Sequence, residues 1–196
     1  MTHSAFPAIG CLVMAAGSSE RFGENKLSKR FGSRTLIERA LSAVPNALFA
    51  RLVVVTQYDW IEQLAREHGF EVIRNDRPDL GASLTIRLGT EAMRECDAIL
   101  YMVADQPLLT RTTVSHIVEA WRKNTAMIVG AGHGGVRGNP NIFPARFFPE
   151  LLQLTGDCGG SRIIRRHEDQ FLLVETPTEE LYDCDTPEAL RALERQ

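Results

Sequence analysis

Near its N-terminus the chain reads Ile9-Gly-Cys-Leu-Val-Met14, followed by Ala15-Ala-Gly-Ser-Ser-Glu-Arg-Phe-Gly-Glu-Asn-Lys26. The first run is apolar throughout and has the length of a strand, so it predicts a strand that is covered on both faces. Such strands occur in parallel sheets with helices packed on both sides. The small and charged residues that follow predict a loop at the carboxyl end of this strand.

Downstream, apolar β-rich runs alternate with stretches of helical periodicity. Further strands are expected at residues 52–55, 70–73, 98–103, 126–129 and 171–174, and helices at 35–44, 60–68, 83–94, 110–122, 160–166 and from 186 onward. Asp59 and Thr110 are the expected N-terminal caps of two of these helices. This alternation predicts an α/β fold with a mostly parallel sheet. Because no linker or repeat divides the chain, residues 1–196 are expected to form one domain.

The composition is that of an ordinary globular protein. Of 196 residues, 44% are hydrophobic and 24% are charged, which excludes a disordered or fibrous chain. The net charge of −3 argues against a general nucleic-acid-binding protein. No apolar run reaches the roughly 18–20 residues of a membrane span, and residues 1–7 lack the basic start of a signal peptide. The four cysteines lie far apart, so free thiols and a cytoplasmic protein are expected.

Unusual residues gather after three of the expected strands, in loops at residues 15–26, 105–107 and 130–140. In open α/β sheets, ligands bind in the crevice beyond the carboxyl ends of the strands. The sequence therefore predicts one binding site at this edge of the sheet, built from segments that are far apart in the chain.

The first of these loops has the composition of a phosphate-binding loop. Gly17 and Gly23 can adopt positive φ, and successive backbone N–H groups can then hold phosphate oxygens. Arg21 and Lys26 add positive charge. The spacing matches neither Gly-x-x-x-x-Gly-Lys-Ser/Thr nor Gly-x-Gly-x-x-Gly, which disfavours an NAD-dependent oxidoreductase.

The pattern Ala-Ala-Gly-x-Ser-x-Arg-x-Gly-x-x-Lys resembles the signature of nucleotidyltransferases with the GT-A-like, Rossmann-type fold, a three-layer sandwich. Within that superfamily the chain is similar to the molybdenum cofactor cytidylyl- and guanylyltransferases over nearly its whole length. The further matching segments are 81–89, Asp105-Gln-Pro107, Gly138-Asn-Pro140 with Phe143, Gly156-Asp157 with Gly159 and Arg162, and Asp183-Cys-Asp-Thr-Pro-Glu188.

The resemblance implies attack by a terminal phosphate of molybdopterin on the α-phosphorus of an NTP, with release of pyrophosphate. Arg21 and Lys26 would then be catalytic, because they can stabilise charge on the leaving group. A divalent cation, Mg²⁺ or Mn²⁺, is expected as cofactor. Its predicted ligands are Asp105, at the end of a buried strand, and Asp185, with Asp183 as a competitor for the second position.

Other site residues are assigned to the two substrates. The residues expected to bind the nucleotide, besides Arg21 and Lys26, are Ala15, Ala16, Gly17, Ser18, Gln57, Asn75, Gly81 and Ser83, and those expected on the molybdopterin side are Asn139, Asp157 and Arg162. For Gln57 the alternative is a residue that merely ends its strand, and for Asn75 an ordinary loop residue. Asp157 and Arg162 can equally be a solvated pair at a helix start.

The choice of base comes from the resemblance: Ala-Ala-Gly after the first strand goes with cytidine nucleotides and Ala-Gly-Gly with guanosine. The methyl group of Ala16 would narrow the floor of the base-binding site at the place where the larger purine base would lie. Met14 is unusual at its position and is expected to pack under the sheet. The implied function is transfer of CMP from CTP to molybdopterin, with a molybdenum hydroxylase as a transient partner. The alternatives are a guanylyltransferase, a cytidylyltransferase for another phosphorylated small molecule, and a non-catalytic delivery chaperone.

Overall fold

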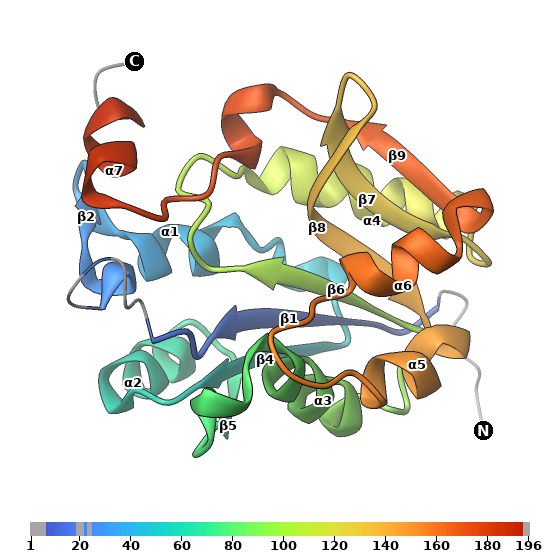
Figure 1. Ribbon diagram of the computed structural model, residues 1–196, viewed down its shortest axis with the longest axis horizontal. Coiled ribbons are helices and arrows are strands. Elements are labelled where there is room, and N and C mark those ends of the chain that lie inside the picture. Colours follow the sequence, from blue (N-terminus) through green and yellow to red (C-terminus); the bar gives the residue numbers. More distant parts are fainter. Residues whose placement is uncertain (1–6, 19–21, 23–24, 194–196) are drawn as a thin grey trace.

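A seven-stranded sheet forms the centre of the molecule in the computed structural model, which describes residues 7–18, 22 and 25–193 (Figure 1). The strand order is β5-β4-β1-β6-β8-β7-β9. The strands of this sheet are β1 (Ile9–Ala15), β4 (Arg51–Thr56), β5 (Glu71–Arg74), β6 (Ala98–Val103), β7 (Ile128–His133), β8 (Val136–Pro144) and β9 (Phe171–Glu175). Only β8 pairs antiparallel to its neighbours, so the α/β class and the mostly parallel sheet are confirmed.

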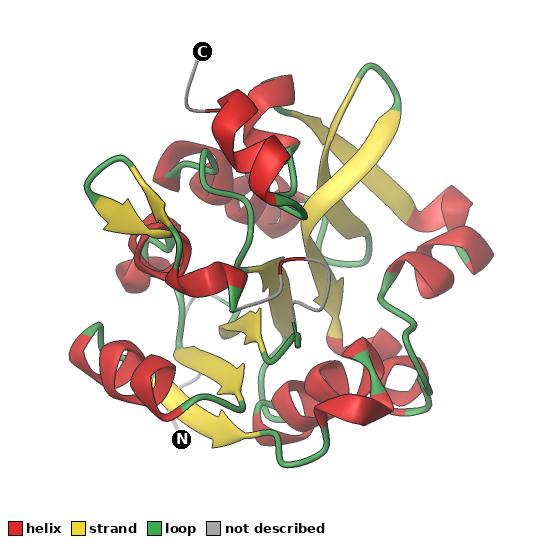
Figure 2. Cartoon of the chain, turned by 60° about the vertical axis from the view of Figure 1, so that its left-hand side comes forward, coloured by secondary structure: helices red, strands yellow, loops and turns green. Residues whose placement is uncertain are grey.

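Helices cover both faces of this sheet, which gives three layers (Figure 2). The helices are α1 (Leu36–Ala43), α2 (Asp59–Glu67), α3 (Ala82–Ala92), α4 (Arg111–Lys123), α5 (Phe148–Leu152), α6 (Ser161–Arg166) and α7 (Pro187–Leu193). One core cluster packs α1, α2, α4 and α7 against one face, and a second packs α3, α5 and α6 against the other. A small hairpin, β2 (Arg30–Phe31) with β3 (Arg34–Thr35), precedes α1.

The central strand β1 contributes side chains to both cores, as its unbroken apolar run predicts. Cys11 and Val13 belong to the first core cluster, and Leu12 belongs to the second. All three side chains are fully buried. The burial of Cys11 raises the pKa of its thiol far above the ordinary value, so this cysteine is an inert core residue. The structure records all four cysteines as free thiols, as expected.

Local capping sets the starts of two helices. Thr35 and Glu38 form a reciprocal capping box at α1, and Thr110 caps α4 by accepting from the N–H of Thr113. The prediction that Asp59 caps the second helix is wrong. Asp59 is the first helical residue of α2 and its side chain binds Arg74, while Tyr58 occupies the cap position without a side-chain bond.

The region 130–140, predicted as a glycine-rich loop, is instead a β-hairpin formed by β7 and β8. Its turn consists of Gly134 and Gly135, both with positive φ. The local sequence does not predict β8, because Gly138 and Pro140 are unfavourable in strands. Pairing of β8 with β6 from Ala98 to Tyr101 supplies the backbone hydrogen bonds that local propensity does not favour.

The strands β1, β4 and β6 run parallel, so their carboxyl ends meet at one edge of the sheet. This arrangement brings the segments that begin at residues 16, 57 and 104 close together. In the part of the chain that the structure describes, no helix is both long and apolar enough to cross a membrane.

Candidate active site

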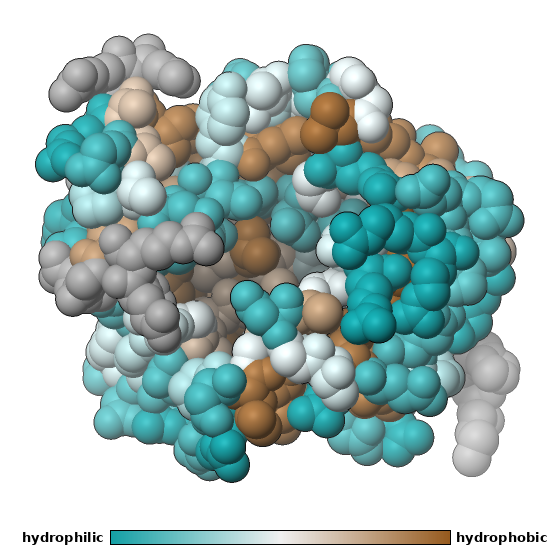
Figure 3. Space-filling view, viewed as in Figure 1, coloured by the Kyte–Doolittle hydropathy of each residue, from teal (hydrophilic) through white to brown (hydrophobic). Residues whose placement is uncertain are grey.

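A cavity of about 950 Å³ opens at the carboxyl edge of the sheet, a volume typical of small-molecule sites. Figure 3 shows the hollow near the centre of this face, with apolar side chains at its floor and hydrophilic ones at its rim. Its walls come from the ends of β1, β4, β5 and β6 and from the start of α3. The predicted site residues that line it are Ala16, Gly17, Ser18, Lys26, Gln57, Asn75, Gly81, Asp105, Asp157 and Asp185.

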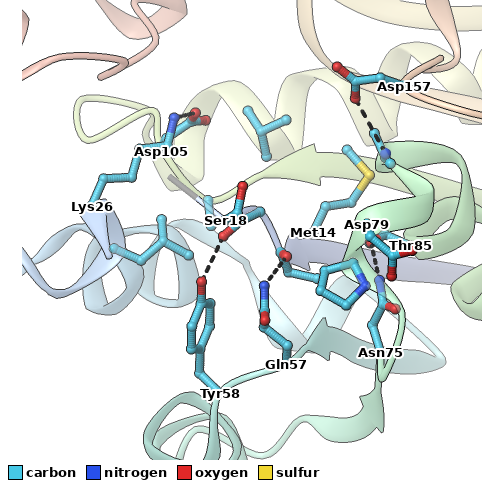
Figure 4. Close-up of a pocket in the computed structure, with 18 of the residues that line it drawn as sticks. Met14, Ser18, Lys26, Gln57, Tyr58, Asn75, Asp79, Thr85, Asp105 and Asp157 are labelled. Atoms are coloured by element: carbon cyan, nitrogen blue, oxygen red, sulfur yellow. Dashed lines mark hydrogen bonds and ion pairs between the residues drawn. The ribbon is translucent and has the colours of Figure 1, made fainter. Parts of the chain in front are cut away.

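The first loop runs along one wall of the cavity. Gly17 does not adopt positive φ, contrary to the expectation for this glycine. Apart from its chain neighbours, no atom of the described residues lies within 4 Å of the place where its Cβ would be. Met14 also lines the cavity, rather than packing only under the sheet, because β1 ends there (Figure 4). The predictions for Arg21 and Gly23 lie outside the described residues.

Lys26 forms ion pairs with two carboxylates at one side of the cavity. Its Nζ lies 2.6 Å from Oδ2 of Asp105 and 2.8 Å from Oδ1 of Asp185. Burial acts to lower the pKa of the Lys26 ammonium group, but the charges and hydrogen bonds of the two aspartates outweigh it and raise the pKa above the ordinary value. Lys26 is therefore a fixed positive charge between two negative groups.

The carboxylates around Lys26 fit a divalent cation. Oδ1 of Asp105 is buried and has no hydrogen-bond partner among the described residues, an arrangement that costs free energy unless a ligand completes it. Two carboxylates on one side of an open cavity match Mg²⁺, which completes its coordination with water and substrate phosphates. Within the described segments, no group of three or more His, Cys, Asp or Glu side chains is placed to hold a metal ion by itself.

Two contacts bring Asp185 to Asp105 although 80 residues separate them in the sequence. The N–H of Cys184 donates to the carbonyl of Asp105 at 2.8 Å, and Nε2 of Gln106 donates to Oδ1 of Asp183 at 3.0 Å. Asp183 is thereby held by Gln106, while Asp185 faces Lys26. Burial, together with the charge of Asp105, raises the pKa of Asp183 to about 6. The geometry thus separates the two candidates for the second acidic position.

At the opposite end of the cavity, polar groups of the lining segments are hydrogen-bonded to one another. Asn75 is buried, donates to Oγ1 of Thr85 at 3.2 Å and accepts from the N–H of Arg77 at 3.0 Å. Oδ1 of Asp157 lies 3.4 Å from the N–H of Ala82, at the start of α3 (Figure 4). The segment around residue 157 therefore closes this end by packing on the helix start.

Four predicted site residues do not line the cavity. Ala15 is buried in the core, and Ser83 is buried with its N–H donating to the carbonyl of Gly156. Asn139 lies on β8, where its side chain accepts from Asn141. Arg162 lies at the start of α6 beside Cys158. The N–H of Ser83 is thus bonded within the protein, and the assignment of Ser83 to the nucleotide stays a prediction.

The family model for the MobA-like NTP transferase domain matches residues 11–171, which include the first loop, Lys26 and Asp105. The chain belongs to the MobA-like NTP transferase family. This confirms the resemblance that the sequence motifs indicated, and with it a nucleotidyltransferase activity.

Relatives of this MobA-like chain differ in their names. It is 24% identical over 190 residues to "Purine catabolism protein PucB" of Bacillus subtilis, covering 90% of this chain and 91% of that protein. It is 27% identical over 142 residues to a "Probable molybdenum cofactor guanylyltransferase" of the same organism, covering 71% and 69%. These comparisons support the family and leave the nucleotide and the acceptor to be established.

Solved structures share the fold of this MobA-like domain. A nucleotidyl transferase from Methanothermobacter has a TM-score of 0.80 at 22% identity, covering 96% of each chain. A protein from Mycobacterium tuberculosis H37Rv, solved as a complex with manganese, has a TM-score of 0.75 at 20% identity, covering 97% of this chain and 99% of that one. Both likenesses confirm the single-domain nucleotidyltransferase fold.

The sequence analysis missed several residues that line the cavity of this MobA-like domain. Among them are Tyr58, Pro78, Asp79, Ala82 and Thr85. Tyr58 follows β4 directly after Gln57, so the carboxyl-edge argument used for Gln57 applies equally to Tyr58. Thr85 lies one turn into α3, inside the matching segment 81–89, from which only Gly81 and Ser83 were assigned to the site. Asp79 sits beside Pro78 in a short turn that reads as an ordinary loop.

Gly81 provides a test of the cavity wall. Its φ of 82° and ψ of −177° lie in a region that is almost restricted to glycine, and an added Cβ would lie 2.6 Å from the backbone of Gly156. We expect Gly81→Ala to reduce the free energy of unfolding by about 1–3 kcal/mol or more, measured by urea denaturation. Gly17→Ala is the matched control, since its Cβ would have no atom of the described residues within 4 Å apart from its chain neighbours. Equal stability of Gly81→Ala and the wild type would contradict this placement.

Proposed function

We propose that the protein transfers CMP from CTP to the terminal phosphate of molybdopterin and releases pyrophosphate. The observation that carries this proposal is the cluster of Lys26, Asp105 and Asp185 at one side of an open cavity whose wall includes Ala16. The cluster suits a triphosphate with its cation, and the Ala-Ala-Gly segment is the one that the family resemblance links to cytidine nucleotides.

The nucleophile in this reaction is already an anion, so the protein has no proton to remove from it. Its task is to hold two anions in line and to stabilise charge on the leaving pyrophosphate. Lys26 is kept protonated by its two aspartate neighbours and would stabilise the negative charge of the phosphates. We assign Arg21 the same role. Asp105 and Asp185 would hold Mg²⁺ or Mn²⁺. The bound cation would neutralise phosphate charge.

The two ends of the cavity are assigned to the two substrates. Ala16, Gly17, Ser18 and Asn75 line the cavity and are proposed to contact the nucleotide. Asp157 lines the far end, where we place the molybdopterin side. Asn139, on β8, and Arg162, on α6, stay proposed for that side although neither lines the cavity.

A guanylyltransferase is the second candidate, favoured by the name of the Bacillus relative. The two candidates share the reaction and differ in the base. The other relative is named for purine catabolism, which supports a molybdenum hydroxylase as the recipient of the finished cofactor. The base preference and the acceptor are thus separate questions with separate measurements.

The base preference tests the proposed role of Ala16. We expect the wild type to have a higher kcat/KM for CTP than for GTP, and Ala16→Gly to reduce this preference about 10-fold. One methyl group contributes about 1–3 kcal/mol of discrimination, so the variant should not become specific for GTP. The measurement is kcat/KM for both nucleotides with the same molybdopterin acceptor. A wild type that prefers GTP would favour the guanylyltransferase, and a CTP preference that Ala16→Gly leaves unchanged would remove the methyl group as its cause.

A further inference from the structure

The last side chain of β4 and the two that follow it bind three consecutive carbonyl groups that run from the end of β1 into the first loop. Oγ1 of Thr56 donates to the carbonyl of Ala15 at 3.0 Å, and Nε2 of Gln57 donates to that of Ala16 at 2.8 Å. The hydroxyl of Tyr58 donates to the carbonyl of Gly17 at 3.0 Å. Figure 4 shows the last two bonds side by side below the loop. The three bonds form a continuous row.

This row continues the sheet beyond the point where backbone pairing stops. Ala15 and Thr56 are the last paired residues of the parallel strands β1 and β4. From that pair onward, side chains of the second segment hold the carbonyls of the first in the same one-to-one register. Oγ1 of Thr56 also accepts from the N–H of Tyr58 at 3.2 Å. This bond fixes the backbone of the turn that carries the three side chains.

The row determines where the N–H groups of the loop point. In a trans peptide the C=O and the following N–H point in opposite directions. Carbonyls held on the side of Gln57 and Tyr58 therefore direct the N–H groups of Gly17 and Ser18 to the other side. Lys26 and Asp105 lie on that other side of the loop in Figure 4. The fixed peptide planes thus present amide dipoles to the part of the cavity assigned to the triphosphate.

We propose that Thr56, Gln57 and Tyr58 are positioning residues that hold the first loop in its phosphate-binding form. They act through the loop's amide groups and not by touching the reacting atoms. This inference rests on the proposed function of the loop. Amide dipoles stabilise developing charge best when they are already oriented before the reaction, so loss of the row should lower kcat more than it weakens nucleotide binding.

The alternative for Gln57 and Tyr58 is direct contact with the nucleotide, since both also line the cavity. Thr56 separates the two explanations, because its side chain is fully buried and is absent from the cavity lining. A contribution of Thr56 to kcat must therefore pass through the first loop or through Tyr58, from whose N–H it also accepts a hydrogen bond. Direct contact by Gln57 would instead show as a changed preference between bases.

The test compares variants that remove one donor each. They are Thr56→Val, Gln57→Met and Tyr58→Phe, with Thr56→Ser as the conservative variant that keeps the hydroxyl. Tyr101→Phe is the matched control, because Tyr101 loses a buried hydrogen bond to Thr90 of similar length, 2.8 Å, and does not line the cavity. Thermal unfolding of each variant reports the purely structural effect.

We expect Thr56→Val, Gln57→Met and Tyr58→Phe each to lower kcat about 10-fold with at most a twofold change in KM. Thr56→Ser and Tyr101→Phe should keep the wild-type kcat. Full kcat in Tyr58→Phe and Thr56→Val would overturn the inference, and so would a loss that appears only in KM or as a changed base preference.

A second measurement separates failure of this inference from failure of the proposed function. Backbone ¹⁵N order parameters of Gly17 and Ser18 should fall from rigid values near 0.85 towards 0.6 in Tyr58→Phe, without any substrate. Titration with pyrophosphate and Mg²⁺ should shift the amide resonances of both residues in the wild type. Unchanged order parameters would overturn the positioning role. A wild type that transfers no nucleotide would instead contradict the proposed function while leaving this readout intact.

Discussion

Asp105→Asn is expected to reduce kcat for pyrophosphate release on the order of 10³-fold or more. The carboxylate lies 2.6 Å from Lys26, its second oxygen is buried without a hydrogen bond among the described residues, and both features suit a cation ligand. The neutral amide keeps the shape of the side chain and removes its charge. Because a metal ion contributes several kcal/mol of charge stabilisation, its loss predicts an effect of this size.

A second pair of variants distinguishes the two acidic residues of the C-terminal segment, Asp183 and Asp185. Asp185→Asn should weaken Mn²⁺ binding, measured by electron paramagnetic resonance, because Asp185 faces Lys26. Asp183→Asn keeps an oxygen that accepts from Gln106 and should retain most of the binding. Full activity of Asp105→Asn, or full activity in EDTA, would contradict the metal site. Stronger loss in Asp183→Asn than in Asp185→Asn would exchange their roles.

Lys26→Ala is expected to lower kcat by about 10²–10³-fold, the usual effect of removing one contact to developing charge. The ammonium group is held between two carboxylates and remains protonated, since their charges raise its pKa. It is therefore a permanent cation at the place assigned to the phosphates. Initial rates at saturating CTP and molybdopterin give kcat, and their concentration dependence gives KM.

Two variants control for this change. Lys26→Arg keeps the charge and should restore part of kcat, and Lys29→Ala removes a nearby lysine that does not line the cavity. Lys29→Ala should match the wild type. An increase in KM alone for Lys26→Ala would make Lys26 a ground-state binding residue instead of a catalytic one.

Much of the fold could be predicted from local sequence. The apolar runs at β1, β4 and β6 are nearly free of polar residues, and the helix starts at Thr35 and Thr110 carry caps. The apolar pattern of a buried strand is local, so the sequence shows it, whereas of the two predicted caps Thr110 is confirmed and Asp59 is wrong. Strand β8 was missed because its stability comes from pairing with β6 and β7, which no window of residues 136–144 shows.

The end of the site that we assign to the phosphates was predictable because each of its residues follows a buried strand or a recognisable motif. Lys26, Asp105 and Asp185 were selected in this way, and they meet in the structure. No sequence motif indicates which side chain will donate a hydrogen bond to a given backbone carbonyl. The hydrogen bonds from Thr56 and Tyr58 to the first loop follow from the register of β1 and β4, which only the assembled sheet defines.

The most direct measurement of the proposed function is pyrophosphate release from each of the four NTPs, with and without molybdopterin, in the presence of Mg²⁺. The account predicts release that requires molybdopterin and is fastest with CTP, together with a cytidylylated pterin product found by mass spectrometry. Release that is fastest with GTP, or that does not depend on molybdopterin, would contradict it.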